Sequence, residues 1–317
     1  MVGTLYVMRR LVAWLLVGAC AAWVVVRVLG LERGFPLVPL LAFTPLAALA
    51  AVVVVAVALL LRQRGAALAA AVVAAVLVVS VAPRALGGPS DAAGPRLTVV
   101  SANMRFGGAS AEALVALVRR SRADVLSVQE LTPSLVQELD AAGLAELLPE
   151  RVLDARPRGQ GIGLFSRLPL APGSAPGERR NPLAVASAQV PGGPAVELVA
   201  VHVPPPLRPP RVDWWHDDMR ALPAATPDGP VRILAGDFNA TLDHAELRRV
   251  LDTGYQDAAA EVGAGLKATW PDGRRFPPPV AIDHVLADER LGVRAFSVHP
   301  IPGTDHRAVV AELVLPR

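Results

Sequence analysis

The sequence contains a single cysteine, Cys20, and it lies in a long apolar run near the N-terminus. The rest of the chain has no thiol, which excludes disulfide bonds, cysteine-based zinc sites and a cysteine nucleophile from that part. A chain of roughly 220 residues can bury a sufficient core without such cross-links. The sequence also lacks an internal repeat long enough to indicate a solenoid.

Most of the chain has no excess of positive charge. The whole sequence has a formal net charge of +3, but residues 1–95 hold seven arginines and only two acidic residues. Residues 96–317 therefore carry 24 basic and 26 acidic residues, a net charge of −2. The basicity belongs to the N-terminal region, and it is not evidence for a nucleic-acid-binding face.

Hydrophobic residues, by contrast, are abundant at 53%, and the mean hydropathy is +0.42. Three apolar runs precede residue 90: Leu11–Leu29, Phe35–Leu61 and Ala66–Ala82. Each approaches the about 20 residues that a helix needs to cross roughly 30 Å of hydrocarbon. A signal peptide would supply only one such run, so three runs predict a retained anchor of three transmembrane helices. A buried helical hairpin in a soluble protein is the alternative.

The charges between these runs predict an orientation. Arg9 and Arg10 precede the first run, and Arg62 and Arg64 join the second to the third. Positive charge favours the cytoplasmic side of a membrane. We therefore expect a multi-pass protein of the cell membrane with a cytoplasmic N-terminus and an extracytoplasmic C-terminal domain, although Arg84 would then be a positive charge on the outer side.

The sequence divides into three parts on this view. Residues 1–82 form the membrane anchor, residues 83–95 form a linker rich in glycine and proline, and residues 96–317 form a soluble domain. Within the domain, about nine apolar runs of strand type alternate with about four segments of helical spacing. This mixed order predicts an α/β sandwich.

Several of the predicted strands end in polar residues. The stretch "ILAGDFNATLD" is an apolar run that stops at Asp237 and Asn239, which would share one face of a strand while Phe238 points to the other. Other polar residues in or after apolar runs are Asn103, Glu130, His202, Asp283, His284, Asp305 and His306. Taken singly, each has an ordinary interpretation as a turn former or a structural hydrogen-bonding group.

Taken together, the motifs "SANMRF", "SVQE", "AVH", "GDFNA", "IDHVL" and "TDHRAVV" occur in an order that resembles the endonuclease/exonuclease/phosphatase (deoxyribonuclease I-like) superfamily. The resemblance covers residues 97–315, and the anchor suggests a membrane-anchored bacterial type. It implies an α/β fold of two packed mixed β-sheets flanked by helices, a four-layer sandwich, here preceded by three transmembrane helices. It also implies a Mg²⁺-dependent phosphoric ester hydrolase.

The resemblance assigns the oxygen ligands first. Asn103 and Glu130 would hold a divalent cation, with Asp305 as a further ligand, and hard oxygen donors suit Mg²⁺ or Mn²⁺. By the same matching, Asp237 would orient or deprotonate the attacking water, and Asn239 would hydrogen-bond the phosphoryl oxygens.

The resemblance also assigns the histidines. His202 and His306 would lie around the scissile phosphate, with Asp283 paired to His306 and favouring its protonated form. His284 would face away from the site if its strand is regular. Some nuclease members pair the middle histidine with an acid near the stretch "GQGIGLFSR", which has none here, so His202 is predicted to lack that charged partner.

Three functions remain open at this stage. The first is a membrane-anchored phosphodiester hydrolase that acts as a nuclease outside the cytoplasm. The second is a phosphodiesterase or phosphatase for lipid head groups, similar to a sphingomyelinase or an inositol phosphatase, and the third is a non-catalytic binding ectodomain. The predicted partners are therefore a phosphodiester, in nucleic acid or a phospholipid head group, and a lipid bilayer; no protein partner is implied.

Residues outside the motifs do not choose between these functions. Trp214 and Trp215 could line a groove but would also pack well in a core. Arg274 and Arg275 could contact phosphate, but arginine in such a loop is commonly just solvated.

Overall fold

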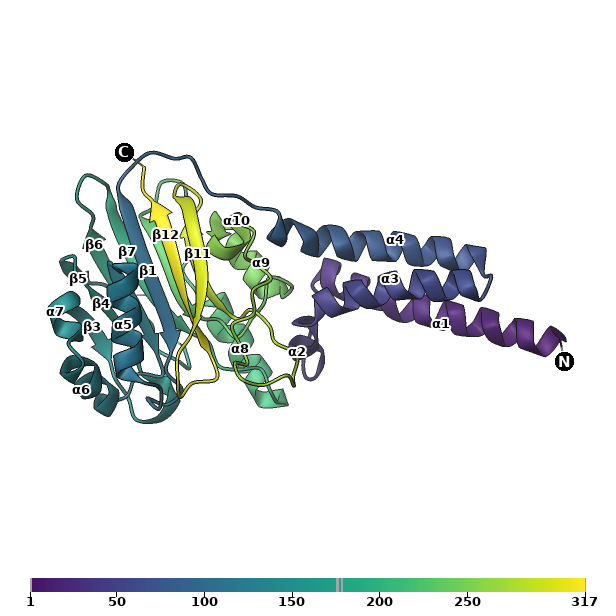
Figure 1. Cartoon of the computed structure of the whole chain (residues 1–317), viewed down its shortest axis with the longest axis horizontal. Coiled ribbons are helices and arrows are strands. Elements are labelled where there is room, and N and C mark those ends of the chain that lie inside the picture. The colour runs from purple at the N-terminus through teal and green to yellow at the C-terminus, as the bar shows by residue number, and fades with distance from the viewer. Residues whose placement is uncertain (1, 175–176, 178, 317) are drawn as a thin grey trace.

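The computed structural model describes residues 2–174, 177 and 179–316, which form an apolar helical bundle and a β-sandwich (Figure 1). The bundle contains α1 (Val2–Leu29), α2 (Leu37–Leu41), α3 (Thr44–Leu60) and α4 (Arg64–Val81), and the 3-10 helix η1 (Ala82–Ala85) follows α4 directly. The three long helices lie side by side and project from one side of the sandwich (Figure 1).

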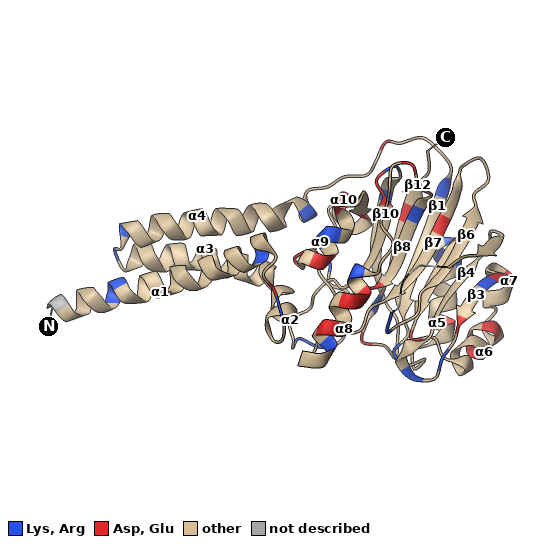
Figure 2. Ribbon diagram, turned by 180° about the vertical axis from the view of Figure 1, so that it is seen from behind, with Lys and Arg blue, Asp and Glu red and all other residues tan. Residues whose placement is uncertain are grey.

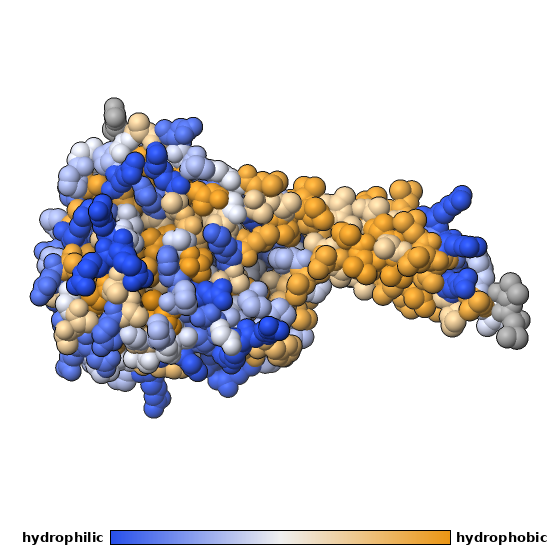
Figure 3. All heavy atoms as spheres, viewed as in Figure 1, coloured by the Kyte–Doolittle hydropathy of each residue, from blue (hydrophilic) through white to orange (hydrophobic). Residues whose placement is uncertain are grey.

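Two of these helices are long and apolar enough to cross a membrane by length and composition. They are Thr4–Leu29 and Arg64–Ala85, whose most apolar windows are only 17% and 33% buried. The bundle therefore presents a largely hydrophobic surface (Figure 3). The third helix, Thr44–Leu60, has 17 residues and is shorter than the predicted span.

The prediction of one helix over Phe35–Leu61 is thus wrong in detail. The run is divided into α2 and α3, with a break at Ala42 and Phe43. Pro45 is one cause, because proline is tolerated in the first turn of a helix but not in its interior. The other cause is packing, since Val38 of α2 is fully buried against the sandwich.

The first sheet has six strands in the order β11-β12-β1-β2-β4-β3. Only β1 and β2 are parallel neighbours, so the sheet is mixed. Its strands are β1 (Arg96–Asn103), β2 (Val125–Gln129), β3 (Glu150–Asp154), β4 (Ile162–Ser166), β11 (Gly292–Pro300) and β12 (Arg307–Val314).

The second sheet also has six strands, in the order β5-β6-β7-β8-β10-β9, and its only parallel neighbours are β7 and β8. Its strands are β5 (Leu170–Pro172), β6 (Ala184–Gln189), β7 (Ala195–His202), β8 (Val231–Asp237), β9 (Tyr255–Asp257) and β10 (Asp283–Asp288). The two sheets share one apolar core between them, and the Ser127 hydroxyl crosses it to donate to the Ala235 carbonyl at 2.8 Å.

Helices cover the outer face of each sheet. The first sheet is covered by α5 (Ala111–Ser121), α6 (Pro133–Ala141) and α7 (Leu144–Leu147), and the 3-10 helix η2 (Arg158–Gln160) precedes β4. The second sheet is covered by α8 (Pro209–Arg220) and α9 (Ala245–Leu251). The short helix α10 (Ala258–Glu261) contacts both β10 and β11. The described residues thus form two mixed six-stranded sheets flanked by helices, which confirms the predicted α/β sandwich.

The predicted linker is packed against the sandwich for part of its length. Ser90 N donates to the Val293 carbonyl at 2.7 Å, and Gly265 N donates to the Arg84 carbonyl at 3.0 Å. Gly87 lies so close to the Glu261 carbonyl that an added Cβ would come within 2.1 Å of it. Small residues in this segment therefore allow two segments of the chain to approach closely, whereas the composition alone predicted only a linker.

Candidate active site

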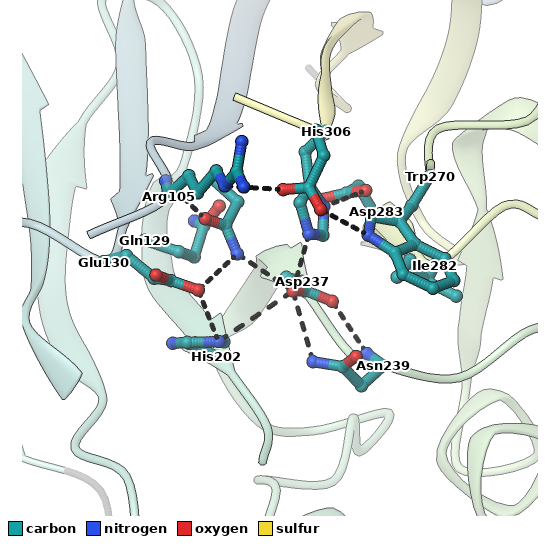
Figure 4. A network of polar contacts seen from close by, with 12 residues as sticks. Arg105, Gln129, Glu130, His202, Asp237, Asn239, Trp270, Ile282, Asp283 and His306 are labelled. Carbon is teal, nitrogen blue, oxygen red and sulfur yellow. Dashed lines mark hydrogen bonds and ion pairs between the residues drawn. The ribbon is translucent and has the colours of Figure 1, made fainter. Parts of the chain in front are cut away.

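The site lies where the central strands of the two sheets end. Asn103 ends β1 and Glu130 directly follows β2, while His202 ends β7 and Asp237 ends β8. His202 and Asp237 are register partners in the parallel pair of β7 and β8. Because parallel neighbours end at the same edge of a sheet, side chains far apart in sequence meet there (Figure 4).

Asn103 joins the two carboxylates at the centre of the site. Its Nδ2 donates to Glu130 Oε1 at 3.2 Å and to Asp237 Oδ2 at 3.0 Å. The Phe106 backbone N–H donates to Glu130 Oε2 at 2.7 Å. Glu130 has a φ of +57°, a left-handed conformation that is costly for a residue with a side chain and that turns the carboxylate out of the strand.

Asp237 and Asn239 share a surface, but a tight turn produces it, not strand alternation. β8 ends at Asp237, Asn239 has a φ of +46°, and its backbone N–H donates to Asp237 Oδ1 at 2.8 Å. Its Nδ2 donates to the Val203 carbonyl at 2.9 Å and to Asp237 Oδ2 at 3.2 Å. Both amide hydrogens are therefore used within the protein, so in this arrangement Asn239 positions Asp237 and has no side-chain donor left for a phosphoryl oxygen.

Trp215 of α8 holds this turn in place by hydrogen bonds to its backbone. It is completely buried, and its Nε1 donates to the Phe238 carbonyl at 3.3 Å and the Asn239 carbonyl at 3.1 Å. Trp214 is only partly buried, with the Arg180 guanidinium 4.9 Å from its ring centre. Of the tryptophan pair, Trp215 therefore helps to shape the site.

His306 and Asp283 form a buried ion pair beside Asp237. His306 Nδ1 lies 3.0 Å from Asp283 Oδ2, and Nε2 lies 3.8 Å from Asp237 Oδ2. Burial alone would lower the pKa of His306, but the two carboxylates outweigh it and raise the pKa to about 10. His306 is thus an imidazolium at neutral pH, placed where negative charge can be stabilised.

His202 has the opposite electrostatic character. Its Nε2 lies 3.8 Å from Glu130 Oε1 and 3.9 Å from Asp237 Oδ2, which are too long for hydrogen bonds. Its Nδ1 makes no hydrogen bond of ordinary geometry among the described residues, although the Gly159 backbone lies beside the ring. Burial, followed by repulsion from His306, lowers the pKa of His202 to about 4. The ring is therefore neutral, and the carboxylates near it come from β2 and β8.

Asp237 is poised to accept a proton. Its side chain is nearly inaccessible, and burial raises its pKa to about 7, with Asp283 acting in the same direction and His306 in the other. A general base works best when its pKa is near the working pH. The geometry and the pKa of Asp237 both suit activation of a water molecule.

Asp305, predicted as a metal ligand, is engaged by positive groups. Arg274 Nη2 donates to its Oδ2 at 2.8 Å, Trp270 Nε1 donates to the same oxygen at 3.2 Å, and Arg105 lies 3.6 Å from Oδ1. Any cation held by Asp305 would have to share the carboxylate with these donors. The same contacts give Arg274 a carboxylate partner beside the site, whereas the sequence left open a phosphate contact or a solvated loop.

The donor set fits a hard divalent cation. Glu130 is a partly buried carboxylate and Asp237 a buried one, and the Asn103 amide links them. Burial raises the pKa of each, so a cation between them would offset the cost of keeping two carboxylates out of water. Asp237, Asp283 and His306 also each offer one ligand atom within 4.8 Å of the others and could hold a metal ion. Since His306 is protonated and paired on both ring nitrogens, we favour the side of Asp237 that faces Glu130.

His284 lies on the opposite face of β10, where the strand alternation put it. Its Nδ1 is 2.8 Å from Asp257 Oδ2 and its Nε2 is 2.9 Å from the Ala240 carbonyl. The ring is buried, and its pKa is raised because Asp257 outweighs the effect of burial. His284 is a structural ion pair, so its removal would cost stability.

Several residues of the site carried no recognisable signal in the sequence. Thr269 Oγ1 accepts from the backbone of Ile282 and Asp283 and so fixes the start of β10. Trp270 contacts Asp305 and lies with its ring 6.5 Å from that of His306. Thr269 and Trp270 belong to a loop whose composition predicts only a turn. The adjacent Thr and Trp at its start could have drawn attention to them, but they match no motif.

Known proteins share this fold. A model of the Endonuclease/Exonuclease/phosphatase family matches residues 100–306. An endonuclease/exonuclease/phosphatase from Beutenbergia cavernae DSM 12333 has a TM-score of 0.54 at 19% identity, covering 70% of this chain and 72% of that chain. Truncated Caenorhabditis elegans TDP2 gives 0.54 at 18% identity, covering 69% and 98%, and D. rerio TDP2 complexed with a single-strand DNA product gives 0.51 at 17%, also covering 69% and 98%. No curated protein has a significantly similar sequence.

Proposed function

This chain belongs to the endonuclease/exonuclease/phosphatase family, and on that premise we propose that it is a divalent-metal-dependent phosphodiester hydrolase, anchored in a membrane, that works outside the cytoplasm. The observation that carries the proposal is the meeting of Asp237, Glu130 and the His306–Asp283 pair at one end of the sandwich (Figure 4). A buried base, an imidazolium and a second carboxylate able to hold a cation are groups suited to phosphoryl transfer.

Each group has a separate role in the proposed reaction. Asp237 accepts the proton of the attacking water, and Asn239 and Asn103 hold its carboxylate in place. The His306 imidazolium stabilises the negative charge that develops on the phosphoryl oxygens. A divalent cation would be held by Glu130 on the side that faces Asp237, with Asn103 and Asp305 as the further predicted ligands, and would supply Lewis-acid polarisation of the same phosphate. His202, being neutral, is available to hydrogen-bond the water or the phosphate.

Metal dependence is the first test of this proposal. The full chain in detergent is expected to hydrolyse bis-p-nitrophenyl phosphate with Mg²⁺ or Mn²⁺, to lose that activity in excess chelator, and to regain it when metal is restored. Glu130→Gln should raise the half-saturating metal concentration at least about tenfold, because even outer partners of metal ligands contribute about 10- to 100-fold to metal affinity.

The matched control for that variant is Glu138→Gln, which changes an exposed glutamate on α6. It should bind metal as the parent does. Equal turnover of the parent in excess chelator would contradict the metal-dependent mechanism.

The membrane orientation rests on the charge distribution along the bundle. Arg9, Arg10, Arg62 and Arg64 are exposed at the end that lies far from the sandwich (Figures 2 and 3). Arg84, which would be a positive charge on the outer side, is buried and paired with Asp243. Its charge is therefore partly balanced within the protein by a carboxylate that it shares with Arg27, which weakens its weight against a cytoplasmic location of the far end of the bundle.

A pair of reporter fusions tests this orientation. We expect a reporter that is active only outside the cytoplasm to be active when fused after Arg317 and inactive when fused after Arg64. The reverse pattern would place the domain in the cytoplasm, where intracellular nucleic acid would be the more plausible substrate.

Nucleic acid is the first candidate substrate. The fold is shared with D. rerio TDP2, which has been solved with a single-strand DNA product. Phe106 and Leu207 are exposed large apolar side chains; Phe106 lies directly beside Glu130, and Leu207 is in the loop that follows His202. Phe106 could stack on an unpaired base, and Leu207 could add an apolar contact.

A phosphate ester in a lipid head group is the second candidate, and a feature of this chain favours it. The segment 265–279 begins at Gly265, which bonds to Arg84 at the end of a candidate span, and reaches Trp270 at the active site. The chain between those two residues spans at most about 18 Å. The segment also carries Phe276, which is 85% exposed, next to Arg274 and Arg275, a combination suited to the surface of an anionic bilayer.

Parallel assays on the full chain separate the two candidates. Single-stranded DNA, RNA, phospholipid vesicles and soluble head-group phosphates would be offered under the same metal conditions. Hydrolysis of nucleic acid with inert vesicles would establish the nuclease, whereas hydrolysis of lipid with inert nucleic acid would establish the head-group enzyme.

A further inference from the structure

A buried ionic contact joins the helical bundle to the sandwich close to the catalytic turn. Asp243, whose side chain is completely buried, accepts from Arg27 Nε at 2.7 Å and from Arg84 Nη1 and Nη2 at 2.8 and 2.6 Å. Arg27 lies in the last turn of α1 and Arg84 in η1, so the two arginines come from the ends of both candidate spans.

Further contacts surround this one. His244 Nε2 lies 2.9 Å from the Val38 carbonyl, the Ala245 backbone N–H donates to the Glu32 carboxylate, and Arg248 Nη2 donates to the Arg27 carbonyl at 2.6 Å. The side chain of Val38 is fully buried in the same apolar cluster as Trp215 and Phe238. The bundle is thus docked on the domain by charge, backbone and core contacts together.

The docked segment is continuous with the catalytic turn. Between Asp237 and Asp243 the backbone is held at successive points: Trp215 bonds the carbonyls of Phe238 and Asn239, and His284 lies 2.9 Å from the Ala240 carbonyl. The Thr241 backbone N–H donates to His244 Nδ1 at 2.9 Å, and the rings of His244 and Trp215 are 5.4 Å apart. The catalytic turn and Asp243 therefore belong to one continuously hydrogen-bonded segment, so loss of the contacts at Asp243 would loosen the segment that begins at Asp237.

We propose that Arg27 and Arg84 are positioning residues of the active site, which hold the turn carrying Asp237 and Asn239 in place through Asp243. This inference rests on the proposed function, since it concerns the geometry of the same base. The helical bundle is then a structural part of the catalytic unit and not a flexible tether. A shift of about 1 Å in a catalytic group can cost a rate about 10²-fold.

The test compares Arg84→Gln and Arg27→Gln with the full parent chain in detergent. Each variant is expected to lower kcat on bis-p-nitrophenyl phosphate about tenfold per folded molecule, with KM within about twofold of the parent, because the small substrate does not touch either arginine. Arg84→Lys, which keeps one charged hydrogen bond to Asp243, should recover most of the lost kcat. Arg33→Gln is the matched control, since Arg33 is exposed in the same region of the bundle.

Hydrogen–deuterium exchange provides a readout that needs no activity. In Arg84→Gln, amides of residues 238–244 should exchange at least about tenfold faster than in the parent, while β7 and β8 keep their protection. If the parent hydrolyses no phosphate ester but this exchange change is seen, the proposed function fails, while the arginines are still shown to hold the turn that carries Asp237 and Asn239.

Two results would overturn the inference. One is parent-like kcat in both glutamine variants; the other is a lower melting temperature with kcat per folded molecule unchanged, which would indicate a purely structural contact. If Arg84→Gln does not fold, Arg84→Lys and Arg27→Gln decide the same question by the same two measurements.

Discussion

Asp237→Asn is expected to lower kcat by about 10²- to 10⁴-fold, the usual contribution of a general base. Asparagine keeps the shape of the side chain, and with its oxygen in the Oδ2 position it can still accept from Asn103 Nδ2 and Asn239 Nδ2. It loses the bond from the Asn239 backbone N–H and cannot accept a proton from water. The measurement is kcat and KM on bis-p-nitrophenyl phosphate at saturating metal. KM should change little, because the lost interaction belongs to the transition state.

The same substitution should not destabilise the protein when divalent cations are absent. The pKa of Asp237 is raised to about 7 by burial, so the folded state binds a proton more tightly than the unfolded state does. Ionisation of Asp237 therefore costs stability as pH rises from about 4 to about 7. Asp237→Asn removes that cost, and its melting temperature should equal or exceed the parent's above pH 7.

A suitable control is Asp252→Asn, which makes the same chemical change at an exposed position. It should leave both rate and stability unchanged. Activity within a few-fold of the parent in Asp237→Asn would show that another group activates the water.

The central site was predictable because local rules determine it. The carboxylates and histidines follow apolar runs of strand type, and parallel neighbours bring such ends together, as the pairing of His202 with Asp237 shows. The sandwich of two mixed sheets was predictable for the same reason. Short strands such as β5 and β9 were missed because three residues carry too little periodicity.

The rest of the site depends on contacts between distant segments, which leave no periodic signal. Arg84 and Asp243 are 159 residues apart, and the sequence singled out Arg84 only as a positive charge on the predicted outer side. Arg105 and Arg274 both engage Asp305, although a carboxylate in that motif suggested only a metal ligand. The sequence predicted that Asp237 and Asn239 share one face of a continuous strand, whereas the structure has a turn there. Both arrangements bring the two side chains to one surface, but their hydrogen bonds differ.

Buried charge also changes which substitutions are informative. Because His284 faces away from the site, its substitution would be the obvious control for that of the catalytic histidine. Its ion pair with Asp257 shows that His284→Ala would leave a buried carboxylate without its partner. His299, partly exposed on β11 and bonded only to Ser297 among the described residues, is the better control.

His306→Ala is expected to lose at least about a hundredfold in kcat, because the imidazolium is the positive group nearest to the base and is placed to stabilise developing negative charge. Unlike Asp237→Asn, it should also destabilise the protein. Asp283 and Asp237 are both nearly fully buried, and removing the cation between them leaves two carboxylates without their partner. Breaking a buried pair in this way costs about 3–5 kcal/mol.

A second substitution separates these two effects. Asp283→Asn in the His306→Ala background removes one of the two uncompensated charges, so the melting temperature should return part of the way to the parent's. The rate should not recover, since the imidazolium is still missing. His299→Ala should match the parent in both measurements. Recovery of kcat together with stability in the double variant would mean that His306 acts only by holding the fold, and that the negative charge of the reaction is stabilised elsewhere in the site.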